Sequence, residues 1–124
     1  MITGTHVLLY STDVDADRNF FRDALSFPSV DAGRGWLIFA LPPAELALHP
    51  GPPITDRDAG ESVRSELYLM CDDLASEIKK LQAKNIECSP VDEARWGSKT
   101  TVRLPSGGKI GFYQPKHPVA IGLK

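Results

Sequence analysis

The sequence predicts an α+β protein in which two βαβββ modules follow one another along a single chain. Residues 6–11 and 66–71 are similar apolar runs, and each begins with an ionisable residue and leads into acidic residues and a helical pattern. Each helical pattern is then followed by three short strand-like runs. The 124 residues suffice for one ordinary domain but not for two independent cores. The two modules must therefore belong to one fold.

The first half opens with a strand and a helix. Side chains in residues 6–11 alternate between a mixed face and a mostly aliphatic face, as is typical of a strand. Asp13 or Asp15 can cap the next helix, which we expect over residues 15–25 because its apolar side chains recur on one stripe. Pro28 prevents the helix from continuing.

Three short strands complete the first half. We expect them at residues 29–31, 36–41 and 45–49, separated by a glycine-containing turn and by Pro42-Pro43. The order of elements in the first half is then β-α-β-β-β.

The second half repeats this order. A strand at residues 66–71 leads to Asp72 or Asp73, either of which can cap a helix over residues 74–84, and Asn85 suits a left-handed helix end. Further strands are expected at residues 87–91, 100–104 and 109–114, with a hairpin turn at 105–108 between the last two.

These elements set the predicted boundaries within a single domain. Module one spans about residues 5–50, a Pro/Gly-rich linker 51–63, module two 64–115, and a tail 116–124.

Composition argues against several classes of partner. The formal net charge is −2 and no Lys/Arg run stands out, so we expect no nucleic-acid binding. No apolar window approaches the length of a membrane span and no signal peptide is evident, which predicts a cytoplasmic protein without membrane contact. Cys71 and Cys88 are too few for a disulfide framework and are expected to be reduced thiols.

The two faces of the predicted strands differ in character. An aliphatic face, which carries Leu46, Leu48, Leu69 and Phe112 among others, is expected to pack against the helices. The other face combines ionisable, aromatic and small side chains, and Ala47 and Gly111 would leave space on it, which is typical of a lined ligand cavity. The predicted ligand-binding residues on this face are His6, Tyr10, His49, Glu66, Tyr68 and Tyr113.

The pattern resembles a known superfamily. Paired βαβββ modules, strand-initial His6 and Glu66, the strand Leu46-Ala47-Leu48-His49 and the closing segment LPSGGKIGFYQ at 104–114 resemble the vicinal oxygen chelate superfamily. That superfamily includes glyoxalase I, extradiol dioxygenases, and fosfomycin-resistance and bleomycin-binding proteins. The resemblance covers about Thr5 to Gln114 and implies an open curled barrel, the glyoxalase/bleomycin-resistance-like fold, in a homodimer.

The resemblance also suggests where a metal would bind. Metal-dependent members take one ligand from the first strand and one from the last strand of each module. The matching positions here are His6 and Glu66, which can coordinate, and Ala47 and Gly111, which cannot. His49 lies two residues beyond Ala47 and could complete a His6/His49/Glu66 set for Fe, Mn, Ni or Zn.

Two functional hypotheses follow from this incomplete set. The first is a small-molecule-binding protein of the glyoxalase/bleomycin-resistance type, which holds a small organic ligand against aromatic side chains and needs no cofactor. The alternative is a divalent-metal-dependent lyase or dioxygenase acting on a vicinal-oxygen substrate. In the first hypothesis His6 and Glu66 pair with each other, or Glu66 pairs with an arginine, and Trp36 and Trp96 line the cavity rim or a dimer contact.

Overall fold

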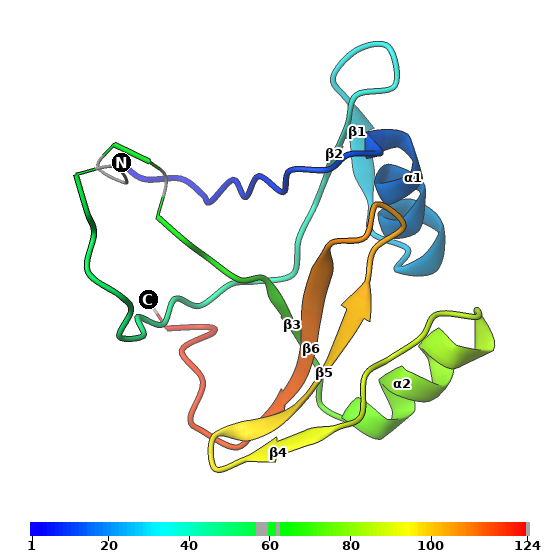
Figure 1. Cartoon of the computed structure of the whole chain (residues 1–124). Coiled ribbons are helices and arrows are strands. Elements are labelled where there is room, and N and C mark those ends of the chain that lie inside the picture. Colours follow the sequence, from blue (N-terminus) through cyan, green and yellow to red (C-terminus); the bar gives the residue numbers. More distant parts are fainter. Residues whose placement is uncertain (57–59, 62, 124) are drawn as a thin grey trace.

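The computed structural model describes residues 1–56, 60–61 and 63–123, and it is an α+β fold with two separate sheets (Figure 1). The elements in chain order are α1 (Val14–Asn19), η1 (Phe20–Ala24), β1 (Ser29–Asp31), β2 (Leu37–Phe39), β3 (Tyr68–Met70), α2 (Leu74–Ala83), β4 (Asp92–Ala94), β5 (Gly97–Arg103) and β6 (Lys109–Pro115).

The second module forms a continuous four-stranded sheet. Its strand order is β3-β6-β5-β4, with β3 parallel to β6 and the other pairs antiparallel. Together with α2 it has the βαβββ order that the sequence predicts. The first module contributes α1, η1 and the antiparallel pair β1-β2.

Local sequence signals account for both helices. The Asp13 carboxylate accepts a hydrogen bond from the Ala16 amide at 3.2 Å and caps α1, which continues into the π-helical turn η1. The Asp73 carboxylate caps α2 in the same way, from the Ser76 amide at 3.1 Å. Asn85 follows α2 with φ of 60°, so its predicted left-handed conformation is confirmed.

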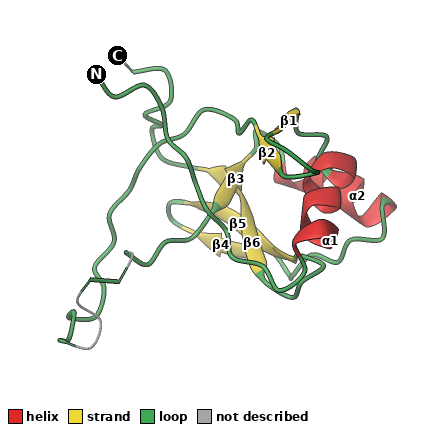
Figure 2. Ribbon diagram, turned by 90° about the horizontal axis from the view of Figure 1, so that it is seen from above, coloured by secondary structure: helices red, strands yellow, loops and turns green. Residues whose placement is uncertain are grey.

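The helices lie on one side of the four-stranded sheet in the view from above (Figure 2), and the core lies between them and the sheet. Leu69, Ile110 and Phe112 project from the sheet toward this side, as predicted. The buried apolar side chains are Phe20, Phe21, Leu69, Leu74, Leu81, Val102, Leu104, Ile110 and Phe112.

Residues 6–11 and 45–49 depart from the prediction. Both segments form no strand and run as extended chain without a ladder partner, so the described residues do not form the expected curled barrel (Figure 1). Leu46 and Leu48 are 86% and 89% exposed, and the prediction that they pack against the helices is wrong for this single chain. The alternation of apolar and polar residues predicts which side chains would share a face if the segment formed a strand. It does not show which other strand the segment would pair with.

One strand of the second module lies further along the chain than predicted. In place of residues 87–91, the edge strand β4 is Asp92–Ala94, and Cys88 makes only an isolated bridge to Val102. Pro90 lacks the amide hydrogen that a continuous ladder would need, so pairing resumes beyond it.

The remaining segments carry little regular structure. Residues 51–56, 60–61 and 63 contain neither helix nor strand; residues 57–59 and 62 of the predicted linker, and residue 124 of the tail, lie outside the described residues. The two ends of the described chain lie on the side away from the helices (Figures 1 and 2). In the described part of the chain, no helix has the length and apolar character needed to cross a membrane.

Candidate functional site

Four rings meet on the face of the four-stranded sheet that points away from α2. Tyr113 is their centre: its ring centroid lies 5.7 Å from that of Tyr68, 5.7 Å from that of Trp96 and 6.0 Å from that of His117. The Tyr68 and Trp96 contacts are edge-on and the His117 contact is stacked. We call Tyr68, Trp96, Tyr113 and His117 the ring cluster.

Strand register brings these residues together. Tyr68 pairs with Gly111 in the parallel β3-β6 ladder, so the next alternate residue of β6, Tyr113, projects from the same face. Lys99 of β5 lies directly across from Tyr113. Trp96 occupies the turn between β4 and β5, at the edge of the same face.

Gly111 has a different role from the predicted one. A Cβ at this position would overlap Cδ1 and Cε1 of Tyr68, so the Tyr68 ring lies directly on the glycine backbone. The space that Gly111 leaves is therefore filled by a ring of the protein, and the prediction that it stays open for a ligand is wrong. Because Gly111 has no Cβ, the Tyr68 ring can lie against the β6 backbone and contact the Tyr113 ring.

Hydrogen bonds hold both tyrosines in place. The Tyr68 hydroxyl donates to Oε2 of Glu66 at 2.9 Å. The Nδ1 atom of His117 lies 2.7 Å from the Pro118 carbonyl oxygen, which can only accept, so Nδ1 carries the proton. In neutral His117, Nε2 then accepts from the Tyr113 hydroxyl at 2.8 Å.

Both phenols are protonated at neutral pH. Burial raises the pKa of Tyr68, and its hydrogen bond to Glu66 and the negative charge there raise it further. Burial also raises the pKa of Tyr113, with a smaller contribution from the charge of Glu45. The two hydroxyls therefore act as hydrogen-bond donors and not as bases.

Lys99 adds a cation to the ring cluster. Its Nζ lies 5.5 Å from the Trp96 ring centroid and 5.9 Å from that of Tyr68, within the range of cation–π attraction. Its carboxylate partner, Asp92, is at 3.9 Å.

The structure gathers only part of the predicted set. Glu66, Tyr68 and Tyr113 lie together, whereas His6, Tyr10 and His49 are exposed on the two unpaired segments, with Tyr10 at 91% exposure. Among the described residues, no group of three or more His, Cys, Asp and Glu side chains could hold a metal ion. The possible His6/His49/Glu66 set is therefore not assembled within one chain.

Two members of this site, Lys99 and His117, were not predicted, whereas Trp96 was expected to line the cavity rim or a dimer contact. Lys99 could have been found by counting back from the predicted hairpin turn, because the β5-β6 register places it opposite Tyr113. His117 lies beyond the last strand, where no periodicity applies, and its position depends on how the chain leaves β6.

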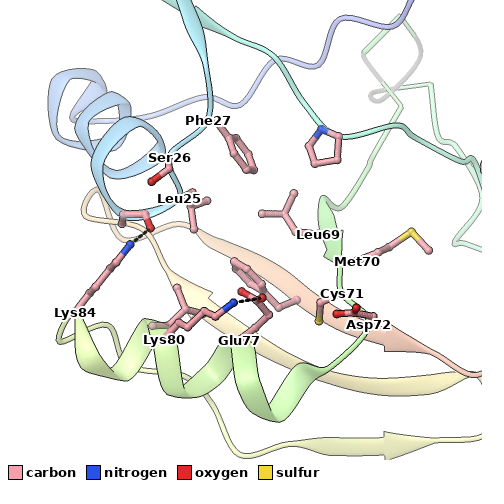
Figure 3. Close-up of a pocket in the computed structure, with 14 residues that line it drawn as sticks. Leu25, Ser26, Phe27, Leu69, Met70, Cys71, Asp72, Glu77, Lys80 and Lys84 are labelled. Carbon is pink, nitrogen blue, oxygen red and sulfur yellow. Dashed lines mark hydrogen bonds and ion pairs between the residues drawn. The ribbon is translucent and has the colours of Figure 1, made fainter.

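A second hollow lies on the helix side of the sheet, between η1 and α2 (Figure 3). It has a volume of about 490 Å³ and a floor that includes Leu69 and Phe112. The nearby cations already have partners: Lys80 pairs with Glu77 at 3.2 Å, and Lys84 donates to a main-chain carbonyl at 2.6 Å. Both cations are thus engaged within the chain, whereas the ring cluster gathers four rings on one sheet face, so we take the ring cluster as the candidate site.

Cys71 borders this hollow without being a reactive group. Burial, followed by the negative charges of Glu77, Asp72 and Asp73, raises the pKa of its thiol to about 11. A thiol with this pKa is almost wholly protonated at neutral pH and is a poor nucleophile. Both cysteines are free thiols, in agreement with the prediction, and burial also raises the pKa of Cys88.

Comparison with known proteins identifies the fold. No family model and no curated protein matches the sequence. Among solved structures, a lactoylglutathione lyase from Agrobacterium tumefaciens is 18% identical, with a TM-score of 0.63 over 90% of this chain and 92% of that one. TnmS3, an antibiotic binding protein from Streptomyces sp. CB03234, is 23% identical, with a TM-score of 0.62 over 94% of this chain and 100% of that one.

A third similar structure is described as a superfamily member. A member of the glyoxalase/bleomycin resistance protein/dioxygenase superfamily from Sphaerobacter thermophilus is 17% identical, with a TM-score of 0.61 over 91% of this chain and 98% of that one. Likeness at this level of identity establishes a shared fold and leaves the chemistry to be argued from the site.

Proposed function

We propose that this chain, which has the fold of the glyoxalase/bleomycin-resistance/dioxygenase superfamily, binds an aromatic or amphipathic small molecule on its ring cluster. The observation that supports this most strongly is the contact of Tyr113 with three further rings on one sheet face. Such a surface offers apolar area and ring edges to a planar ligand, and the hydroxyls and Lys99 can orient it. The similarity to TnmS3 adds support, since that protein binds an antibiotic.

Binding to the ring cluster can be measured with a neutral aromatic probe. Titration calorimetry with 1-naphthylmethanol is expected to show binding that is tighter than for its non-aromatic counterpart cyclohexylmethanol. Trp96→Leu or Tyr113→Leu should weaken naphthylmethanol binding by about three- to tenfold, the effect of losing one aromatic contact. The matched control is Trp36→Leu, because Trp36 is also exposed but packs under the Arg18 guanidinium, 4.6 Å from its centroid. An equal loss in Trp36→Leu, or equal affinity for cyclohexylmethanol, would contradict the proposal.

The rival function is a metal-dependent lyase or dioxygenase. The similarity to a lactoylglutathione lyase favours it, but the donor side chains do not fit a metal within the described chain, because no three of them are gathered. Adding a chelator to the titrations separates the two functions. Binding that persists with chelator supports the binding protein, and binding that disappears supports the rival.

We further infer that the chain forms a homodimer. Its accessible surface is 10040 Å², whereas a compact monomer of this mass exposes about 6,600 Å². The excess is larger than the roughly 1,000–2,500 Å² that each subunit buries in many obligate dimers. The extended segments 6–11 and 45–49 contribute to this excess, and Leu8, Leu46 and Leu48 on them are exposed. Strand β3 is an edge strand, so a second copy could pair with it.

Light scattering after size-exclusion chromatography tests the dimer. The expected mass is twice that of the chain, because the exposed apolar strand segments are covered by a second copy. Leu48→Glu should shift the mass toward that of one chain, while Ile54→Glu, an equally drastic change at an exposed position outside both segments, should not. A wild-type protein with the mass of one chain at micromolar concentration would refute the dimer.

A further inference from the structure

Lys99 places a positive charge directly on the ring cluster. It lies across from Tyr113 in the β5-β6 ladder, and its Nζ is 5.5 Å from the Trp96 ring centroid and 5.9 Å from that of Tyr68. Its side chain is only 28% exposed, so neighbouring atoms shield most of it from solvent. The ammonium is therefore held at the surface that we propose for ligand binding.

The ammonium of Lys99 is poorly satisfied within the chain. Its carboxylate partner Asp92 is 3.9 Å away, which is longer than a hydrogen bond, and the Asp92 side chain is 67% exposed. Among the described residues, no oxygen accepts a hydrogen bond from Lys99 Nζ. By contrast, the ammonium groups of Lys80, Lys84 and Lys116 donate to oxygens at 3.2, 2.6 and 2.9 Å. Because a loose, exposed ion pair contributes little, Lys99 can exchange Asp92 for a ligand at low cost.

The other polar hydrogens of the ring cluster are mostly engaged. The Tyr68 hydroxyl donates to Glu66, the Tyr113 hydroxyl donates to Nε2 of His117, and Nδ1–H of His117 faces a main-chain carbonyl. Within the described part of the chain, the groups still able to donate are the Lys99 ammonium and the Trp96 indole N–H. Both are donors, so a matching ligand supplies acceptors.

The carboxylates near the cluster do not cancel this preference. Glu93 is neutralised by Lys116 at 2.9 Å. Glu66 opposes an anion, but it contacts the hydroxyl end of Tyr68, whereas the Lys99 ammonium lies over the ring. A ligand anion is therefore drawn toward Lys99 and away from the Tyr68 hydroxyl, which would give the ligand one orientation.

We propose that the ligand is an aromatic acid, in which a planar ring system carries a carboxylate, and that Lys99 binds the carboxylate while the ring system packs on Trp96 and Tyr113. Lys99 is then a residue that determines specificity, because its ammonium forms a charge-assisted hydrogen bond that a neutral ligand of the same shape lacks. This inference rests on the proposed function and adds the charge class of the ligand.

Three probes that share one ring system test the charge class. At neutral pH 1-naphthoic acid is an anion, 1-naphthylmethanol is neutral and 1-naphthylmethylamine is a cation. In calorimetric titrations of the full chain, the acid is expected to bind about tenfold more tightly than the alcohol, and the amine most weakly, because Lys99 attracts the first and repels the last. Added salt should weaken binding of the acid more than binding of the alcohol.

Variants assign the preference to Lys99. Lys99→Met keeps a long apolar side chain without the charge and should remove most of the tenfold difference between acid and alcohol, whereas Lys99→Arg should keep it. The matched control is Lys116→Met, which removes the same charge from a lysine already paired with Glu93 and should leave the preference intact. Glu66→Gln should tighten binding of the acid, because it removes the opposing charge. Circular dichroism shows whether each variant is folded.

The outcomes separate this inference from the proposed function. Equal binding of all three probes, tighter binding of the amine, or an acid preference that persists in Lys99→Met overturns the role of Lys99 and leaves the aromatic site standing. An equal loss of preference in Lys116→Met overturns it as well, because general attraction by positive charge would then suffice. Failure of all three probes to bind overturns both proposals. An acid preference lost in Lys99→Met and kept in Lys99→Arg and Lys116→Met supports the inference.

Discussion

Gly111→Ala is expected to destabilise the protein by about 1–3 kcal/mol, the usual cost of forcing extra volume into a packed site. The new Cβ would overlap two ring atoms of Tyr68, and the ring would have to leave its position against Tyr113. Binding of 1-naphthylmethanol should fall with stability, because the displaced ring is part of the ring cluster. Urea unfolding measures the first effect and calorimetry the second.

Two controls isolate the ring contact. Gly108→Ala adds the same methyl group in the preceding turn, where nothing lies within 4 Å, and should change stability by less than about 1 kcal/mol. Repeating Gly111→Ala in a Tyr68→Ala background removes the overlap and should recover most of the cost. If Gly111→Ala were as costly without the Tyr68 ring, the packing explanation would be wrong.

Asp17→Ala is expected to reduce the free energy of unfolding by about 3 kcal/mol, since it removes two hydrogen bonds to a charged group. Asp17 is 7% exposed, and its carboxylate accepts from the Ser106 amide at 3.0 Å and from the Ser106 hydroxyl at 2.6 Å. These bonds tie α1 of the first module to the turn before β6. Without them the Ser106 amide loses its side-chain acceptor in a partly buried position.

Asp15 supplies the matched control on the same helix. Its side chain is 88% exposed and pairs with Arg18 at 3.5 Å. Exposed pairs of this kind contribute about 0–1 kcal/mol, so Asp15→Ala should unfold almost like the wild type in urea. Similar losses for Asp15→Ala and Asp17→Ala would show that the link between the modules does not matter for stability.

Short-range chemistry made several features predictable. Asp13 and Asp73 cap the helices because a carboxylate can reach an amide three residues later, and this needs no tertiary contact. The same holds for Asn85 at the end of α2 and for the hairpin turn between β5 and β6, whose Gly107 has φ of 100°. The identity of the sheet face that packs against α2 followed from alternation, since Leu69 and Phe112 are two ladder partners on one side.

The ring cluster was only half predictable. Tyr68 and Tyr113 share a face by alternation, and the turn fixes Lys99 opposite Tyr113. The burial of Asp17 against Ser106 joins positions 89 residues apart, and no local pattern marks such a pair. His117 reaches the cluster from a segment outside any strand, where side-chain direction is not periodic.

The sequence by itself determined the elements whose signals lie within a few residues: both capped helices, the β5-β6 hairpin and the alternation of faces along β3 and β6. The side chains and segments that pack against those faces were determined only by the tertiary structure. It left residues 6–11 and 45–49 extended and unpaired, filled the space above Gly111 with Tyr68, and placed His117 beside Tyr113. The physical reason is that caps and turns are satisfied by neighbouring residues, whereas strand pairing and ring packing depend on partners that the chain must bring from far away.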